Sequence, residues 1–220
     1  MPLSLEIIKN LYGFSIAKYS TWFYYKPDHI LFDAGEGISV TMRNTIYGIN
    51  SVFLSHGHGD HIAGLPGLIR SRASSMGDKA RPLTIYYPKG DYNIIKLQKY
   101  VQETVDKLPF EISWNELIAG NKIELASNRV IEAFSSAHVP NSLTLGYRII
   151  ESRVKLKEEF RNLPKDDILN LIKKEGKEKL SETYNHTLFC FSGDSMPLDK
   201  ELINGRSEEH TSELQSRQVI

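Results

Sequence analysis

The stretch "SVFLSHGHGDHIAGLPG", residues 51–67, places three histidines and an aspartate within six consecutive positions. In an extended loop, side chains two residues apart point the same way, so His56 and His58 can converge on one ion. Asp60 and His61 follow where a strand passes into a helix, and they can face a second position nearby. Imidazole and carboxylate ligands suit zinc, and also manganese or iron. The loop therefore predicts a metal site on a strand-to-helix turn rather than a chance histidine-rich surface.

Short apolar runs alternate with helical patterns along the rest of the chain, which predicts an α/β fold with sheet in the middle. Strands are expected at 4–9, 20–25, 29–35, 51–57, 82–88, 121–126, 129–137, 143–150 and 187–195. "KPDH", residues 26–29, predicts a hairpin turn between two of them. A helix is expected after Asp60, with Asp60 as its N-cap, and another over 91–106, where apolar residues recur at helical spacing.

Composition excludes several classes of protein. The 220 residues are enough for one substantial domain, and 27 basic residues balance 27 acidic ones, so nucleic-acid binding has to come from a local patch. The single cysteine, Cys190, excludes an internal disulfide and a thiolate zinc cluster, and we expect it to be a small buried hydrophobe. No run reaches the roughly 18 apolar residues of a membrane span, and the start lacks a signal-peptide pattern, so we expect a cytoplasmic protein.

Five motifs follow one another in the order found in one family of hydrolases. They are "LFDAGEG" (31–37), "VFLSHGHGDHIAGLPGLIRSR" (52–72), "RPLTIYYPKG" (81–90), "SSAHVPNSLTLGYRI" (135–149) and "FSGDS" (191–195). The sequence thus resembles the metallo-β-lactamase superfamily, whose signature is His-x-His-x-Asp-His. Within it, the sequence looks like the ribonuclease Z branch, endonucleases that trim tRNA precursors. The resemblance runs from about Leu31 to Ile203 and implies an αββα sandwich that works as a zinc-dependent phosphodiesterase.

The resemblance also implies two zinc ions and their ligands: His56, His58 and His138 for the first ion, Asp60 and His61 for the second, and Asp194 as the bridge. Such a pair of ions clamps both oxygens of an in-line phosphoryl displacement. Asp60 would also position the attacking water and accept its proton, which makes it the candidate catalytic residue. The products would be a tRNA with a free 3′-hydroxyl and a trailer that begins with a 5′-phosphate.

Three of the residues outside the loop have chemical arguments of their own. Asp194 ends an apolar strand, where a carboxylate is costly unless it is paired, binds a metal, or caps a following helix. Asp33 also ends an apolar run, and we interpret it as the residue that orients a metal-bound histidine. His138 precedes a Pro-Asn turn and can swing into a site, although a lone histidine there is more often structural or exposed.

Residues 151–187 form a charged insertion with nine basic and eight acidic residues, a net charge of only +1. The insertion lies where the resemblance implies an arm that grips the elbow of tRNA, and a solvated helix is expected within it over 163–180. The charge of the insertion does not distinguish an arm that binds tRNA from a solvent-exposed helical segment that binds nothing. The resemblance implies a tRNA precursor as partner, and a homodimer.

The N-terminal "NLYGFSIAKYSTWFYY", residues 10–25, departs from the Gly-rich turn usual in the family. Together with the weakly charged insertion, this departure keeps two alternatives open. One is a hydrolase of the same fold that acts on a small-molecule phosphodiester or another ester. The other is a non-catalytic metal-binding protein of this fold.

The end of the chain has a different character. "RSEEHTSELQS", residues 206–216, matches the translation of a common sequencing adapter. We therefore expect residues 1–205 to be an incomplete hydrolase domain, with the C-terminal part missing, and residues 206–220 to be a non-native tail. The resemblance implies a further second-site histidine well beyond Asp194, and His210, which lies in the tail, is not assigned to that role.

Overall fold

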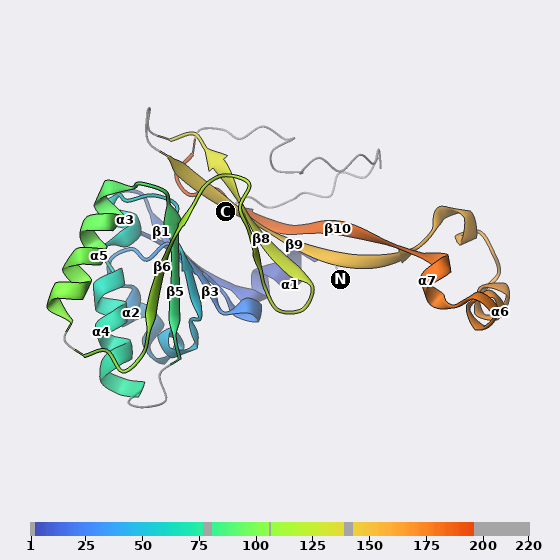
Figure 1. The fold of residues 1–220 in the computed structure, drawn as a ribbon, viewed down its shortest axis with the longest axis horizontal. Helices are drawn as coiled ribbons and strands as arrows, with labels where there is room; N and C mark the ends of the chain where they lie inside the picture. Colours follow the sequence, from blue (N-terminus) through green and yellow to red (C-terminus); the bar gives the residue numbers. More distant parts are fainter. Residues whose placement is uncertain (1–2, 77–80, 106, 139–142, 196–220) are drawn as a thin grey trace.

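A computed structural model describes residues 3–76, 81–105, 107–138 and 143–195 (Figure 1). The six-stranded sheet has the order β1 (Leu11–Ile16), β2 (Ser20–Tyr25), β3 (Ile30–Phe32), β4 (Ser51–Phe53), β5 (Leu83–Pro88) and β6 (Ile112–Leu117). The four-stranded sheet has the order β10 (Ser181–Phe191), β9 (Thr144–Leu156), β8 (Arg129–Ser136) and β7 (Lys122–Glu124). The strands from β3 to β6 run parallel, whereas β1, β2 and all of the second sheet pair antiparallel.

Two hydrophobic cores define the layers. The first lies between the six-stranded sheet and its helices: α2 (Ile38–Met42), the 3-10 helix η2 (Arg43–Gly48), α3 (Gly59–Ile62), α4 (Leu65–Met76) and α5 (Tyr92–Thr104). Figure 1 shows these α-helices together on one side of that sheet. The second core lies between the two sheets and is rich in aromatic rings, among them Phe32, Phe53 and Tyr147. The described residues thus form three layers, helix, sheet and sheet, of the predicted αββα sandwich.

The parallel strands place their following loops at one edge. Ile30 and Phe32 of β3 enter the inter-sheet core while Leu31 enters the helix-side core, so the strand is buried on both faces. Parallel strands need helical crossover connections, so their carboxyl ends lie at the same edge of the sheet. Ligand-binding sites of α/β proteins lie at this edge. The loops after β3, β4 and β5 all begin there.

Most predicted elements are confirmed, including the hairpin at 26–29, which the 3-10 helix η1 (Lys26–Asp28) closes. The strand predicted at 4–9 is wrong, because residues Leu3–Asn10 form helix α1. Within this helix Ile7 packs against the inter-sheet core, and a six-residue apolar run does not by itself distinguish a strand from a helix. Strands β1 and β6 were not predicted. Within the described ranges, every helix is too short or too polar to cross a membrane.

Asp60 is not the N-cap that the sequence predicts. Helix α3 begins at Gly59 with His58 in the N-cap position, and Asp60 is the second helical residue. The helix also stops after Ile62, and α4 begins at Leu65. Gly64 occupies the break, and a Cβ there would lie 2.0 Å from the carbonyl oxygen of Gly35, so only glycine allows this approach. Because Asp60 lies within the first turn and not at the N-cap position, its carboxylate does not cap this helix and instead accepts from the backbone N–H of Lys18.

The charged insertion is mostly a ribbon rather than a single helix. Strands β9 and β10 stay paired out to Leu156 and Ser181 and carry η4 (Glu158–Phe160), α6 (Lys165–Glu175) and α7 (Lys177–Leu180) at the tip. Gly176, with φ of +86°, divides the helix predicted over 163–180 into two. Figure 1 shows this arm, the continuation of β9 and β10, extending beyond β8 and away from the six-stranded sheet. Helix α6 buries none of its residues, as the solvated-helix prediction requires.

Candidate metal centre

Four loops bring the predicted ligands to the carboxyl edge of the parallel strands. Asp33 follows β3 directly, and the loop from Leu54 to His58 follows β4. From the second sheet, His138 lies two residues after the end of β8 and Asp194 lies three residues after the end of β10. Residues far apart in the sequence therefore meet because both sheets end at the same place.

The first group consists of His56, His58 and His138. Each offers a ring nitrogen, and these three atoms lie within 4.8 Å of one another. The Nε2 atom of His138 lies 3.4 Å from the Nδ1 atom of His58. His56 is buried, whereas His58 is exposed, so the group spans from the interior to the surface. This is the trio that the resemblance implies for the first ion.

The second group consists of His56, His61 and Asp194, whose ligand atoms also lie within 4.8 Å of one another. The Nε2 atom of His61 is 3.4 Å from Oδ1 of Asp194 and 3.7 Å from Oδ2 of Asp60. Oδ2 of Asp194 lies 3.8 Å from Nε2 of His138, in the first group. Asp194 thus faces both groups with its two oxygens, and His56 belongs to both.

Asp33 is fully buried and sets the protonation pattern of the two interior histidines. A carboxylate only accepts hydrogen bonds, so Nδ1 of His61, 2.6 Å from Oδ2, donates to it. The Ser55 hydroxyl also donates to Oδ2, at 2.8 Å. Having spent its one proton, that hydroxyl accepts from Nδ1 of His56 at 3.0 Å. Both histidines are therefore held with Nε2 toward the centre, because the Nδ1–H of His61 donates to Asp33 and the Nδ1–H of His56 donates to Ser55.

The Nε2 atoms of His56 and His61 are buried and have no hydrogen-bond partner among the described residues. Unpaired buried polar atoms are costly, and such atoms in a native protein call for a partner. Two imidazole nitrogens that converge with a carboxylate match the donor set of a zinc ion, whose histidine ligands usually donate their other N–H to a carboxylate or carbonyl. The residues therefore fit a metal centre.

The two interior histidines differ in charge. Burial, together with the neighbouring histidines, lowers the pKa of His56 to about 2, so its imidazole is neutral. Burial also acts to lower the pKa of His61, but the hydrogen bond and charge of Asp33, with Asp194 and Asp60, outweigh it and raise that pKa to about 9. For Asp33 itself, burial raises the pKa of the carboxyl, against the hydrogen bonds from His61 and Ser55.

These pKa values predict how metal binding depends on pH. Below pH 9 the metal-free His61 carries a proton on Nε2 that a metal must displace, so affinity at its position should rise about tenfold per pH unit up to about pH 9. Calorimetric metal titration in buffers of different ionisation enthalpy measures the released proton. Asp33→Asn removes the charge that raises the pKa of His61, so the steep range should end at lower pH. An affinity that does not change between pH 6 and 9 would contradict this assignment.

Three residues of the centre were missed from the sequence. The Ser55 hydroxyl donates to Asp33 and accepts from His56, and so links these two side chains. Asp91 caps α5 through Oδ1, while its Oδ2 accepts from the backbone N–H of Gly57 at 2.8 Å and so anchors the histidine loop. The N–H of Lys18, in the turn between β1 and β2, donates to Oδ2 of Asp60 at 3.1 Å. An acidic residue directly before the helical pattern at 92 was the signal for Asp91, whereas no local pattern marks Lys18.

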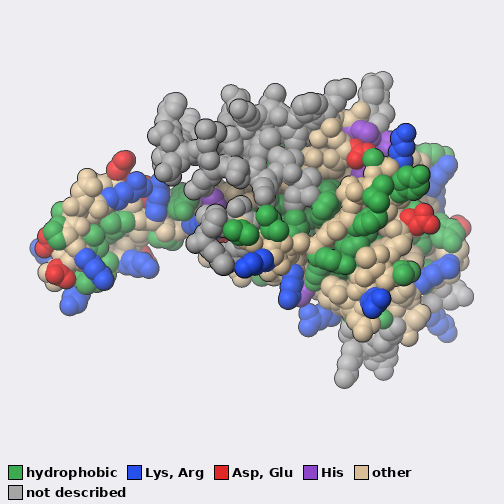
Figure 2. Space-filling model, turned by 180° about the vertical axis from the view of Figure 1, so that it is seen from behind, with side chains coloured by type: hydrophobic (Ala, Val, Ile, Leu, Met, Phe, Trp, Pro, Cys, Tyr) green, Lys and Arg blue, Asp and Glu red, His purple; other side chains and the backbone are tan. Residues whose placement is uncertain are grey.

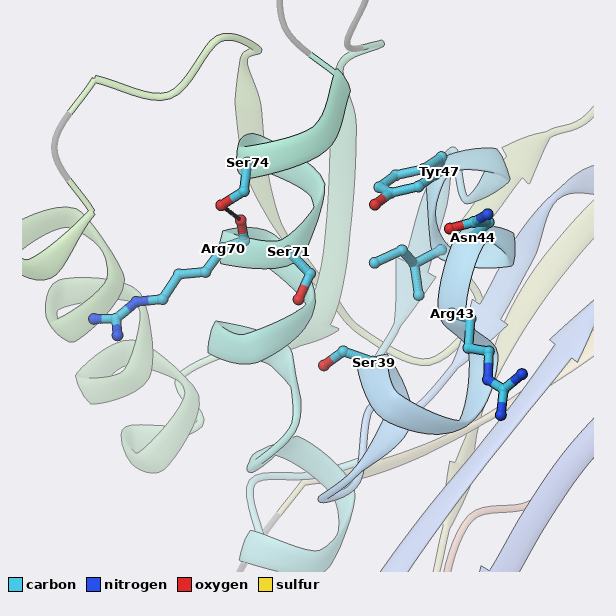
Figure 3. Close-up of a pocket in the computed structure, with 8 residues that line it drawn as sticks. Ser39, Arg43, Asn44, Tyr47, Arg70, Ser71 and Ser74 are labelled. Atoms are coloured by element: carbon cyan, nitrogen blue, oxygen red, sulfur yellow. Dashed lines mark hydrogen bonds between the residues drawn. The ribbon is translucent and has the colours of Figure 1, made fainter.

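A separate groove of about 410 Å³ lies between η2 and α4 and holds none of the predicted ligands (Figure 3). Serine hydroxyls, Asn44 and Tyr47 line it, and Figure 3 shows the side chains of Arg43 and Arg70 extending away from each other at its borders. Among the described residues that line the groove, no charged side chain points into it (Figure 3).

Comparison with known proteins gives a family for the chain. Residues 12–156 match the family described as "Beta-lactamase superfamily domain". Ribonuclease Z of Ligilactobacillus salivarius is 43% identical over 90 residues, which is 40% of this chain and 28% of that protein. Ribonuclease Z of Methanosarcina mazei is 36% identical over 130 residues, covering 58% of this chain and 40% of that protein.

Ribonuclease Z of Haloarcula marismortui matches over a longer stretch, 29% identical over 191 residues, or 78% of this chain and 60% of that protein. The chain thus spans 28% to 60% of the length of these relatives. Among solved structures, human tRNase Z, short form, superposes with a TM-score of 0.53 at 22% identity, covering 64% of each chain. That similarity supports the fold.

Proposed function

Because the chain belongs to the beta-lactamase superfamily and has its metallo-hydrolase fold, we propose that it is a zinc-dependent endoribonuclease that removes 3′ trailers from tRNA precursors. The observation that carries the proposal is the pair of ligand groups that share His56 and face one another through Asp194. In this proposal His56, His58 and His138 hold a first ion, Asp60 and His61 hold a second, and Asp194 lies between them. Manganese or iron would fit the same donors.

A pair of divalent ions lowers the pKa of a water and offsets charge on the phosphoryl oxygens, which is the chemistry that phosphodiester hydrolysis requires. The chain's own residues supply the rest. Asp60 lies beside His61, and the Lys18 N–H holds one of its oxygens, so the carboxylate is oriented to accept the proton of the attacking water. The water oxygen bonds to phosphorus as the phosphorus–O3′ bond breaks, and the departing O3′ takes up a proton from solvent, which leaves the 3′-hydroxyl on the tRNA and the phosphate on the trailer.

The substrate is supported by the named relatives and by the arm. Several relatives carry the name ribonuclease Z. The arm is long, and Figure 2 shows Lys and Arg side chains over its surface. Ion pairs occupy Arg153 and Lys155 on the two-stranded ribbon, whereas Lys173 and Lys174 lie in the last turn of helix α6 at the tip. We propose that these tip cations contact the phosphates of tRNA at a distance from the metal centre.

Incubation with a tRNA precursor that carries a 3′ trailer tests the function directly. We expect one cut that releases the trailer, abolished by a chelator and restored by zinc. Removing residues 155–182, the distal arm, should abolish tRNA cleavage while sparing a chromogenic phosphodiester, because the ligands lie outside the arm. Equal loss on both substrates would contradict the role of the arm.

The two alternatives predict different results in the same experiment. A same-fold hydrolase of small esters would cleave the chromogenic diester well and leave the tRNA precursor intact. A non-catalytic metal-binding protein would bind zinc tightly and turn over neither substrate. The Asp60 carboxylate does not cap its helix and is instead oriented by the backbone N–H of Lys18. A carboxylate held in this way beside the ligands favours an enzyme over the non-catalytic alternative.

A further inference from the structure

Strand β1, in the segment that departs from the family pattern, exposes a row of apolar side chains. Tyr12, Phe14 and Ile16 occupy alternate positions of β1 and therefore share one face, and Tyr19 follows in the turn to β2. These four residues, here called the β1 strip, are between 41% and 73% exposed. Such a concentration on one short strand at the edge of a sheet is uncommon in a soluble domain and indicates a binding surface.

The two β1 rings of the strip rest on a rigid base. Trp22 of β2 lies opposite Phe14 in the ladder and is 1% exposed. Its ring is stacked with Phe14 at 6.4 Å and 19°, and tilted against Tyr12 at 5.4 Å and 58°. The outward faces of both rings are thus held in place before any ligand arrives, which lowers the entropic cost of stacking on them.

The strip starts at the metal centre. The turn that carries Tyr19 is bound to Asp60 through the Lys18 N–H, and Ser20 next to it donates to the carbonyl of Glu36 at 2.8 Å. From this turn, β1 leads away from the centre with side chains of one face about 6.7 Å apart at every second residue. Figure 2 shows hydrophobic side chains gathered on the face below the histidines. A ligand on the strip would therefore continue into the catalytic position.

Charge selects the kind of ligand. Between Leu11 and Tyr25 the chain has no acidic residue, and its single charge is the exposed Lys18. Flat aromatic faces beside one cation, on a segment that carries no carboxylate of its own, match a single-stranded nucleic acid whose bases stack on side chains. We propose that the β1 strip is a stacking platform for the unpaired nucleotides next to the cleaved bond, with Tyr19 nearest the metal centre. This inference rests on the proposed ribonuclease function.

Binding without cleavage tests the platform. The chelated full chain is titrated with a labelled single-stranded oligoribonucleotide and with an abasic strand of the same length, followed by fluorescence anisotropy. Tyr19→Ala should weaken binding of the oligoribonucleotide about fivefold or more and leave the abasic strand unchanged, whereas Tyr19→Trp should restore binding. Tyr19 is 73% exposed, so its replacement leaves the fold intact. Tyr100→Ala on α5, 46% exposed, is the matched control and should bind as the parent does.

Failure of the platform differs from failure of the proposed function. Parent-like binding of the oligoribonucleotide by Tyr19→Ala and Phe14→Ala, in a chain that still cleaves tRNA precursors, would overturn the platform alone. The opposite result is that the parent chain cleaves no tRNA precursor but binds the oligoribonucleotide more tightly than the abasic strand, and that Tyr19→Ala loses this difference. This result would support the platform and reject the proposed substrate. Should Phe14→Ala instead dissolve a dimer without altering RNA affinity, the strip is a protein interface and the inference is wrong.

Discussion

Replacing His56 with alanine is expected to remove nearly all bound metal and all hydrolysis. Loss of a residue that merely orients a metal ligand costs about 10–100-fold in affinity. His56 belongs to both ligand groups, so its loss should exceed about 100-fold at each position. His58→Ala should abolish hydrolysis too, but His58 belongs to one group only, so part of the metal bound near His61 and Asp194 should survive. Elemental analysis of the purified variants gives the metal content directly.

A histidine outside both groups provides the control. His29 is half-buried, and its Nδ1 lies 2.9 Å from the Tyr24 hydroxyl, away from the candidate ligands. His29→Ala should keep the metal content of the parent even where it lowers thermal stability. Near-normal metal in His56→Ala would refute the ligand assignment, whatever its activity.

The second large effect is expected for Asp60→Ala, which should lower turnover by about a hundredfold or more with a small loss of stability. A positioned general base contributes about 10²–10⁴-fold to rate, and Asp60 is also a proposed metal ligand. In the fold, its carboxylate accepts one hydrogen bond, from the Lys18 N–H, and loss of one such bond costs only about 1 kcal/mol.

Asp60→Asn separates these roles. The amide oxygen can still accept from Lys18 but takes no proton at neutral pH, so this variant should keep the parent's melting temperature and lose turnover. Turnover per folded molecule is compared with the melting temperature of each variant. A variant that unfolds at the growth temperature yet keeps full specific activity when folded would make Asp60 a structural residue.

Local sequence patterns were enough to predict the superfamily and most of the strands. The histidine loop lies on a strand-to-helix turn as predicted, and the α/β fold of the predicted superfamily is confirmed. Short apolar runs were less decisive. The segment at 4–9 forms helix α1 with Ile7 against the inter-sheet core, and a six-residue apolar run does not distinguish a helix from a strand. The predicted tail at 206–220, with His210, lies outside the described residues.

The ligand set was named from residue type and resemblance, and the tertiary structure decides which of those residues meet. Asp33 follows a strand of the six-stranded sheet, whereas His138 and Asp194 follow strands of the four-stranded sheet. They converge because the carboxyl ends of β3 and β4 lie beside the ends of β8 and β10. The zinc ions, the tRNA precursor and the homodimer stay predictions.

By itself, the sequence determined that this chain carries a metal-binding loop between a strand and a helix. The reason is that the directions in which the His56 and His58 side chains point depend only on the extended backbone of three consecutive residues. Only the tertiary structure decided that Ser55 links Asp33 to His56, that Asp60 turns to Lys18 rather than capping its helix, and that β1 lies open beside the centre. Local geometry follows from neighbours in the chain. Hydrogen bonds between residues 22 to 42 positions apart depend on how sheets and helices pack, and packing is a property of the whole domain.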